Sequence, residues 1–229
     1  MLSYNYLGGE TTMNDFFYTF TIWFLLFIIY SFIGWVFEVV LTLVKTGKFV
    51  NRGFLIGPVI PIWGAGCLLI TLFLKDQSVL RLIIFSGTIG AILEYVVNYL
   101  MEKLFKARWW DYSHLPFNIN GRIWLGSVLL FGFGGLFVVK FISPWIFKIL
   151  HLLDLTMLYA IGGILFGVLL ADIIISTGII KNLKLSAEAM QQDYTVEITR
   201  KVKKVLESKS NEFKRLLKAF PNVKFYRKK

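Results

Sequence analysis

The sequence predicts an all-α fold, a polytopic bundle of about five transmembrane helices, and composition is the first reason. Of the 229 residues, 56% are hydrophobic and only 17% are charged, and the mean hydropathy is +0.65. Soluble domains carry about 25% charged residues. The second reason is length, because several apolar segments reach the roughly 20 residues that a spanning helix needs. These observations exclude a soluble secreted enzyme and a disordered chain. Cys67 is the single cysteine, so a disulfide scaffold is excluded as well.

Five segments are long and apolar enough to span a membrane. The second of them carries Pro58 and Pro61, with several glycines nearby, in its first half. Because proline removes a backbone donor and clashes with the preceding turn, we expect this span to be kinked or broken there. Broken helices often line the substrate sites of transporters. The five predicted spans cover residues 16–44, 54–74, 80–101, 123–139 and 155–180.

A sixth apolar segment, over residues 144–153, is too short to span a bilayer. It carries Lys148, His151 and Asp154. These polar residues favour a helix that lies at the membrane surface, so we expect an interfacial helix here. If the segment does span, the bundle has six helices, and the basic loops move to the outer side.

The uneven distribution of basic residues predicts the orientation. Residues 181–229 contain 14 Lys and Arg against 5 Asp and Glu, whereas the first 180 residues contain 11 against 9. Cytoplasmic loops of membrane proteins are enriched in Lys and Arg. With five spans, the basic loops 45–53 and 102–122 lie on the cytoplasmic side together with the tail. We therefore expect a multi-pass protein of the cell membrane with its C-terminus in the cytoplasm. Because membrane lipids account for the basic charge, nucleic acid is not an expected partner.

We expect two parts, a transmembrane helical domain over residues 1–180 and a basic cytoplasmic tail over residues 181–229. Apolar residues recur every three or four positions between about Ser186 and Phe220, which predicts an amphipathic helix. Such a helix lies on a membrane or docks on a partner. Met13 is an alternative start of the protein, in which case residues 1–12 are dispensable.

Three carboxylates lie inside predicted spans, where charged groups are costly and mark candidate functional sites. Glu38, Glu94 and Asp172 each precede the basic residue at the end of their helix by seven to nine positions. At about 1.5 Å per residue, this places them roughly 10–14 Å from those basic residues. The three helices run in the same direction, so we expect the carboxylates at one depth near the inner leaflet and facing one another.

The two inner loops supply polar partners for these carboxylates. A guanidinium beside a carboxylate satisfies both groups in a low-dielectric site, so we expect Glu38 near Arg52 and Glu94 near Arg122. Such pairs either line a binding site or only fix the helix register. With one cysteine and two histidines, neither a metal site nor a cofactor is expected. The predicted substrate-binding residues are Glu38, Asn51, Arg52, Glu94, Asn98, Trp110, Asp111, Tyr112, Asn118, Asn120, Arg122 and Asp172.

Six short motifs, in order along the chain, resemble a known family. The chain between about residues 20 and 180 is similar to the ABC-transporter permease family of Gram-positive bacteria. The resemblance implies a multi-pass, permease-like membrane protein, but it transfers no substrate and no catalytic residue. The motifs are GWVFE at 34–38, NRGFLIGP at 51–58, PIWG at 61–64, EY at 94–95, WDYS at 110–113 and FNINGR at 117–122.

Three functions fit these observations, and the first is a transporter permease component that binds a small solute or ion at the buried polar cluster. The chain has no phosphate-binding loop of the Walker type, so an ATPase would be a separate subunit. Five spans are few to enclose a complete transport pathway, so the chain is expected to assemble either with such a subunit or with further copies of itself. The second function is an integral membrane enzyme or a lipid-headgroup-binding protein, although no catalytic motif is visible. The third is a membrane scaffold whose tail binds a partner.

Overall fold

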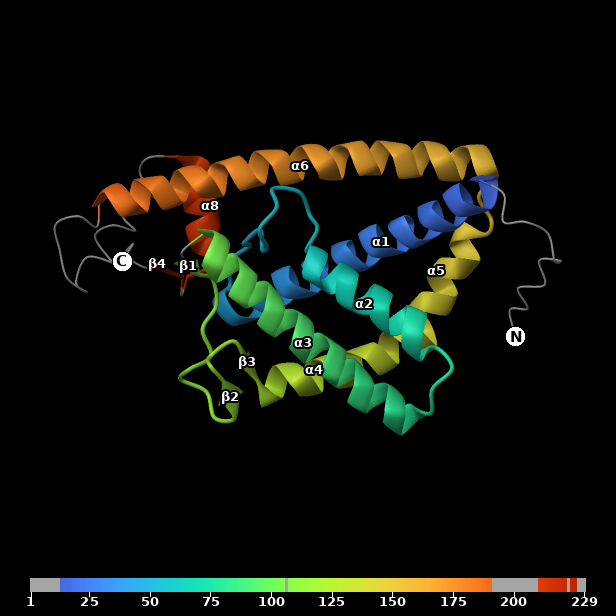
Figure 1. Cartoon of the computed structure of the whole chain (residues 1–229), viewed down its shortest axis with the longest axis horizontal. Helices are drawn as coiled ribbons and strands as arrows, with labels where there is room; N and C mark the ends of the chain where they lie inside the picture. Colours follow the sequence, from blue (N-terminus) through green and yellow to red (C-terminus); the bar gives the residue numbers. More distant parts are fainter. Residues whose placement is uncertain (1–12, 106, 191–209, 222, 226–229) are drawn as a thin grey trace.

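The computed structural model describes residues 13–105, 107–190, 210–221 and 223–225, and most of them are helical. Figure 1 shows long helices with short strand pairs at one end of the molecule. The helices are α1 (Met13–Thr46), α2 (Pro61–Leu74), α3 (Val79–Phe105), α4 (Leu125–Phe137), the π-helical segment η1 (Val138–Ile142), α5 (Ser143–Leu150), α6 (Leu155–Met190) and α8 (Asn211–Ala219). The strands are β1 (Ala107–Arg108), β2 (Asn118–Ile119), β3 (Ile123–Trp124) and β4 (Lys224–Phe225).

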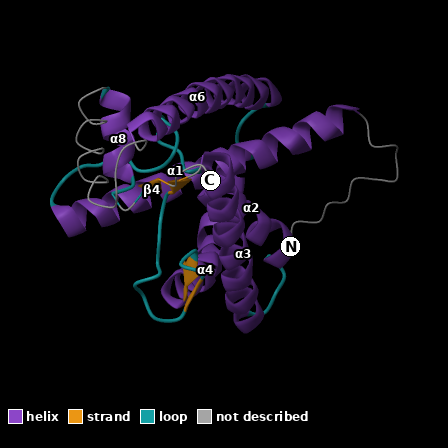
Figure 2. Ribbon diagram, turned by 60° about the vertical axis from the view of Figure 1, so that its left-hand side comes forward, coloured by secondary structure: helices purple, strands orange, loops and turns teal. Residues whose placement is uncertain are grey.

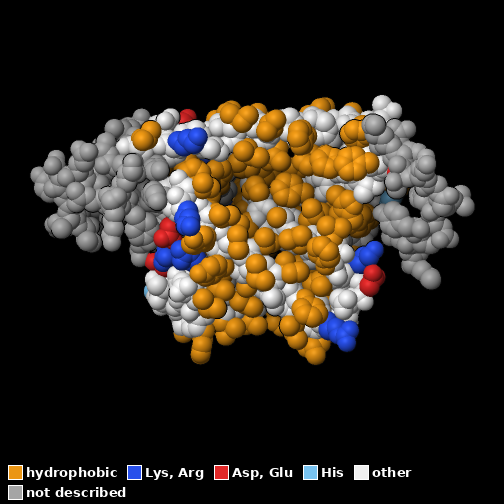
Figure 3. All heavy atoms as spheres, in the orientation of Figure 1, with side chains coloured by type: hydrophobic (Ala, Val, Ile, Leu, Met, Phe, Trp, Pro, Cys, Tyr) orange, Lys and Arg blue, Asp and Glu red, His pale blue; other side chains and the backbone are white. Residues whose placement is uncertain are grey.

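The long helices alternate in direction, as the five-span prediction requires. In Figure 1, α1, α3 and α6 run from right to left, whereas α2 and α4 run from left to right. Four helical stretches are long and apolar enough to cross a membrane, and they cover Asp15–Thr46, Val79–Phe105, Leu125–Leu150 and Leu155–Leu183. Figure 3 shows a broad apolar belt over the helices, with the charged side chains gathered at its two ends. The fold is therefore that of a helical membrane protein.

The two ends of the bundle differ. We call the end where α1 and α3 finish the polar end, because residues 47–60, residues 107–124 and α8 gather there. The opposite end holds the turn over residues 75–78 and the connection from α5 to α6.

The second predicted span is broken at the polar end, as the prolines indicate. Residues 51–60 follow an irregular path, and a helix forms only from Pro61, where proline is tolerated because its missing N–H lies in the first turn. The backbone N–H of Ile60 donates to the carbonyl of Ser31 at 3.0 Å, which ties the irregular segment to α1. With 14 residues, α2 is about 21 Å long and shorter than a full span.

The segment predicted as an interfacial helix, residues 144–153, overlaps α5. It is not separate from the preceding span, because α4, η1 and α5 form one helical stretch, Leu125–Leu150, that is long and apolar enough to cross a membrane. The chain bends at η1, and α5 crosses the opposite end of the bundle toward α6 in Figure 1. The Ser143 hydroxyl donates to the carbonyl of Val138 at 2.9 Å, within the π-helical turn. It also lies 2.7 Å from the Tyr30 hydroxyl and 3.1 Å from that of Thr71. This buried group of three hydroxyls joins α1, α2 and α5.

Small residues bring α3 and α4 into close contact. A Cβ atom at Gly90 would overlap the ring of Phe131, and one at Gly135 would overlap Ser86. Close approach of this kind stabilises helix pairs in membranes through van der Waals packing. Gly134, the neighbour of Gly135, has open space where its side chain would be. The contact between α3 and α4 therefore requires a small residue at position 135, which faces α3, but not at position 134, which does not.

The described part of the tail packs onto the polar end. Helix α6 continues through residue 180 to Met190, and the tail then contributes α8 and β4, which pairs antiparallel with β1. Figure 2 shows α8 beside the end of α6. The predicted tail helix over 186–220 is thus seen at its two ends, and the remainder, residues 191–209, lies outside the described residues. The buried apolar cluster that joins α8 to the bundle comprises Phe105, Ala107, Trp109, Ile180, Leu183, Phe213, Leu216, Leu217 and Val223.

A pair of adjacent substitutions tests the contact between α3 and α4. Gly135→Ala is expected to lower the free energy of unfolding by about 1–3 kcal/mol, because the new methyl group overlaps Ser86. Gly134→Ala adds the same methyl group to open space and is expected to be neutral or to stabilise by up to about 1 kcal/mol. Thermal unfolding of the two variants in detergent measures the difference. Equal effects at the two positions would contradict the packing.

A second prediction concerns the docking of α8. Leu216 is 1% exposed in the cluster, so Leu216→Ala is expected to cost about 2–5 kcal/mol of docking free energy. Chymotrypsin should then cleave the tail faster than in the wild-type protein. Asn211→Ala, at an exposed position of the same helix, is the control and should leave the cleavage rate unchanged. The docking is refuted if the Leu216→Ala variant is as resistant as the control.

Candidate functional site: a buried polar cluster

Glu94 is the most buried of the three predicted carboxylates. It lies on α3 and is 7% exposed. The Tyr112 hydroxyl, from the loop between α3 and α4, donates to Oε1 of Glu94 at 3.0 Å. Burial, and then the charge of Glu94, raise the pKa of Tyr112, so this hydroxyl keeps its proton and acts as a donor. The second carboxyl oxygen, Oε2, is buried and accepts no hydrogen bond of ordinary geometry, although the Ser127 side chain of α4 lies close to the carboxylate.

Asn98 lies one turn after Glu94 on the same face of α3 and is 1% exposed. Its Nδ2 donates to the carbonyl of Trp110 at 3.0 Å, which holds the loop against the helix. Its Oδ1 is buried and has no donor. Glu94 and Asn98 therefore each present one acceptor without a partner.

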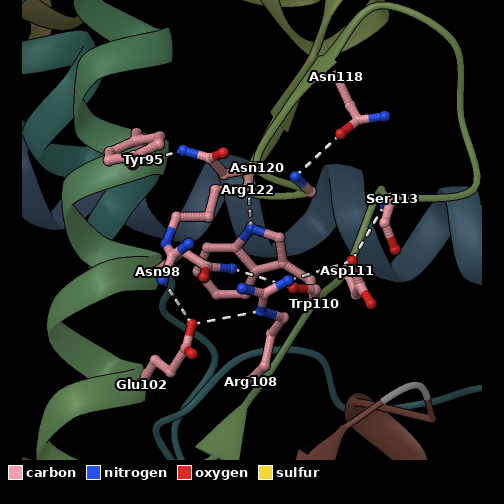
Figure 4. A network of polar contacts seen from close by, with 11 residues as sticks. Tyr95, Asn98, Glu102, Arg108, Trp110, Asp111, Ser113, Asn118, Asn120 and Arg122 are labelled. Carbon is pink, nitrogen blue, oxygen red and sulfur yellow. Dashed lines mark hydrogen bonds and ion pairs between the residues drawn. The ribbon is translucent and has the colours of Figure 1, made fainter.

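Below these two residues, an ionic network closes the end of α3 (Figure 4). Arg122 donates to Oε2 of Glu102 at 2.7 Å, and Arg108 approaches the same oxygen at 3.3 Å. Arg108 also lies 3.5 Å from Oδ1 of Asp111. The pairing expected between Glu94 and Arg122 is thus wrong, because Glu102 is the partner of Arg122.

The loop over residues 111–121 is ordered by its own polar side chains. Asn118 donates to the carbonyl of Leu115 at 2.6 Å, and its Oδ1 accepts from the N–H of Gly121 at 2.9 Å. Gly121 has a φ of 66°, and a Cβ atom there would overlap Asp111. The position requires glycine for both reasons.

Two further predicted residues attach this loop to the helices. Asn120 donates to the Tyr95 hydroxyl of α3 at 3.1 Å. The indole N–H of Trp110 donates to the carbonyl of Arg122 at 3.3 Å. The guanidinium of Arg122 lies 5.5 Å from the ring centroid of Tyr95, which adds a cation–π contact. These side chains hold the loop in place, and the Nε atom of Arg122 is buried without a hydrogen-bond partner.

Glu38 and Arg52 form the second part of the cluster, and their predicted pairing is confirmed. Arg52 Nη2 lies 3.5 Å from Glu38 Oε2, and Glu38 is close enough to Glu94 to repel it electrostatically. Arg52 also donates to the carbonyl of Ala219 at the end of α8. Asn51 accepts from the Trp35 indole N–H at 2.7 Å and donates to the carbonyl of Ile56 at 2.8 Å. Asn51 therefore shapes the irregular segment after α1.

Asp172 is at the polar end as predicted, but its partners are backbone amides. Its two carboxyl oxygens accept from the N–H groups of Ile56 at 2.9 Å and Gly57 at 2.8 Å. The hydroxyl of Ser176, one turn later on α6, donates to Oδ1 at 2.8 Å. This carboxylate holds the segment over residues 51–60 through both of its oxygens. Of the three predicted carboxylates, Glu38 and Glu94 are the two that interact electrostatically.

Sequence reasoning missed Glu102 and Arg215. Glu102 follows Glu94 and Asn98 at intervals of four residues, so a helical wheel of α3 places all three on one face. Arg215, on α8, donates to the carbonyls of Phe54 at 3.2 Å and Leu55 at 2.9 Å. Burial lowers the pKa of Arg215 from its very high ordinary value. No sequence signal connected Arg215 with residues so far away in the chain.

The cluster suits a ligand that donates hydrogen bonds or carries positive charge. Its unsatisfied buried groups include two oxygen acceptors one turn apart, within electrostatic reach of a second carboxylate, and also the donor Nε atoms of Arg52 and Arg122. A buried acceptor without a donor costs roughly 1–3 kcal/mol, which a bound donor recovers. Among the described residues, no three His, Cys, Asp or Glu side chains are arranged to hold a metal ion.

Comparison with known proteins gives one match. No curated protein and no solved structure is significantly similar to this chain. One protein family, described as "Putative ABC-transporter type IV", has a sequence model that matches residues 25–177. The match includes α2 to α4 and nearly all of the residues that build the polar cluster. The chain therefore belongs to this ABC-transporter family.

Proposed function

We propose that this protein is the membrane-spanning permease component of an ABC-type transporter and binds a small cation or a solute with hydrogen-bond donors between Glu94 and Asn98. The family and the apolar helices support a transporter component. In this proposal a separate ATPase subunit supplies the energy for transport. If the spans of one chain are too few to enclose a transport pathway, a homo-oligomer completes it.

The observation that carries the binding site is the pair of buried, unpartnered oxygens, Glu94 Oε2 and Asn98 Oδ1. Polar groups inside a membrane protein are costly unless they are satisfied, so such residues mark ligand pathways. The two atoms lie on adjacent turns of α3, which favours one small ligand that contacts both. Glu38 places a second carboxylate within electrostatic reach of Glu94, although its charge is offset by Arg52.

We also propose that the polar end faces the cytoplasm. It carries more basic residues than the opposite end, which is the asymmetry that the positive-inside rule describes. The polar end holds Lys45, Lys48, Arg52, Lys103, Arg108 and Arg122, in addition to the basic tail, whereas the opposite end holds Lys75, Arg81, Lys140 and Lys148. In this orientation the candidate site lies near the inner leaflet, and the C-terminus is cytoplasmic.

The other two functions have less support. A headgroup-binding enzyme at this cluster would need Arg52 and Arg122 to face a phosphate, but both are paired with carboxylates. A scaffold that offers the apolar face of its tail helix to a partner would need that face to be free. In the structure, Phe213, Leu216 and Leu217 are buried against the bundle.

A substitution at Glu94 tests the site. The purified protein is titrated with monovalent cations, divalent cations and small alkylammonium ions while its thermal unfolding is followed in detergent. At least one of these ions is expected to raise the unfolding temperature of the wild-type protein. Glu94→Gln keeps the size of the side chain but removes its charge, so the apparent affinity for that ion should fall at least about tenfold.

The matched control is Asp76→Asn, which removes one negative charge from the exposed turn at the opposite end. This variant should respond to the ion as the wild-type protein does. The site assignment fails if Glu94→Gln responds like the control, or if none of the ions stabilises the wild-type protein.

Thiol labelling tests the orientation. In a Cys67→Ala background, Lys48→Cys places a single thiol at the polar end, and Asp76→Cys places one at the opposite end. A membrane-impermeant maleimide applied to intact cells is expected to label the Asp76→Cys variant only. The Lys48→Cys variant should react after the membrane is permeabilised. The reverse pattern would place the polar end outside.

A further inference from the structure

A basic pocket lies at the polar end, between α8 and the chain that follows α1. Its volume is about 280 Å³. One wall is formed by residues 49–51 and the other by one face of α8, where the lining positions 211, 214, 215 and 218 follow helical spacing. The residues that line it are Phe49, Val50, Asn51, Asn211, Lys214, Arg215 and Lys218.

The packing of α8 explains why this face is basic. The apolar face of the helix is buried against the bundle, so the opposite face is left for the pocket and solvent. Arg215 is held at the boundary by its hydrogen bonds to the carbonyls of Phe54 and Leu55. Lys214 and Lys218 are one turn apart on the same face, where two like charges destabilise a helix. A bound anion would remove this repulsion.

The positive charge of the pocket is only partly balanced within the described part of the protein, because Asp172 and Glu212 attract Arg215 electrostatically. Of the ion pairs found there, none includes Lys214, Lys218 or Arg215. The acidic residue of α8, Glu212, accepts a hydrogen bond from the Ser210 hydroxyl at 2.8 Å in the first turn. The Nε atom of Arg215 is buried and has no acceptor. Among the described residues, Lys214 and Lys218 therefore have no carboxylate ion-pair partner that would compete with a bound anion.

The position of the pocket indicates which anion is available. Its wall at residues 49–51 directly follows the end of α1, whose last turn carries Lys45. Phe49 is 66% exposed, and an exposed apolar ring beside Lys and Arg side chains suits the boundary between lipid headgroups and acyl chains. We propose that this pocket binds the phosphate group of an anionic phospholipid, with Lys214 and Lys218 contacting the phosphate and Phe49 the adjoining apolar region.

This site is separate from the one proposed for transport. It uses none of the buried acceptors of α3, and it selects an anion, whereas Glu94 and Asn98 select a donor or a cation. Binding of a lipid here would also anchor α8, because the helix forms one wall of the pocket. Failure of either proposal leaves the other intact.

Lipid binding to the full-length protein tests the proposal. The protein is purified in a nonionic detergent and titrated with short-chain phosphatidylglycerol, or with phosphatidylcholine of the same chain length, and native mass spectrometry counts the bound lipids. Phosphatidylglycerol is expected to bind at least tenfold more tightly. In the Lys214→Gln/Lys218→Gln variant its affinity should fall about 30-fold, since each basic residue near a lipid phosphate contributes several-fold.

The control variant, Lys75→Gln/Arg81→Gln, removes the same charge from the opposite end and should bind phosphatidylglycerol as the wild-type protein does. Equal thermal stability of the two double variants shows that both are folded. The proposal is overturned if the variant at α8 retains its affinity, or if the two lipids bind equally well. It is also overturned if inorganic phosphate displaces phosphatidylglycerol at equal concentration, because the ligand is then a soluble phosphate.

Discussion

The irregular backbone over residues 51–60 imposes the constraint on which the polar end depends. Non-helical chain at the boundary of a membrane leaves N–H and C=O groups that need partners, and these are costly to bury unpaired. Asp172 of α6 accepts from two of the N–H groups, and Arg215 of α8 donates to carbonyls of the same segment. A carboxylate satisfies the donors and a guanidinium satisfies the acceptors. The break in the second span therefore explains why α6 carries an acid and why the tail folds back.

The need of buried polar groups for partners also separates polar residues whose hydrogen bonds are all made within the protein from those with an unpaired polar atom. Asn51, Asn118 and Asp111 complete turns or hold backbone groups within the loops, and Asn51 also accepts a hydrogen bond from Trp35 of α1. Asn98 is different, because its amide nitrogen holds the loop while its oxygen has no donor. Glu94 shows the same division between its two oxygens. In Glu94 and Asn98, a purely structural role would explain the polar atom that is hydrogen-bonded, but not the one that has no partner.

The helical pattern of this protein could be predicted from its sequence because apolar runs and prolines act locally. The break near Pro58 and Pro61 and the pairing of Glu38 with Arg52 follow from composition and spacing. The partner of Arg122 did not follow, because Glu94 and Glu102 lie on the same helix face and only the path of the loop decides between them. The docking of α8 depends on apolar contacts with α6 and with residues 105–109, which are about a hundred positions away, and no local pattern contains these contacts.

Arg52 connects the tail to the candidate site, because it contacts a residue of each. Its guanidinium lies between the carboxylate of Glu38 and the carbonyl of Ala219, at the C-terminal end of α8. The last carbonyls of a helix have no partner within it and carry partial negative charge, so a cation is favoured there. Glu38 in turn lies within electrostatic reach of Glu94. If α8 moved away, Arg52 would lose the carbonyl acceptor of Ala219, and the electrostatic balance between the two carboxylates of the site would change with it.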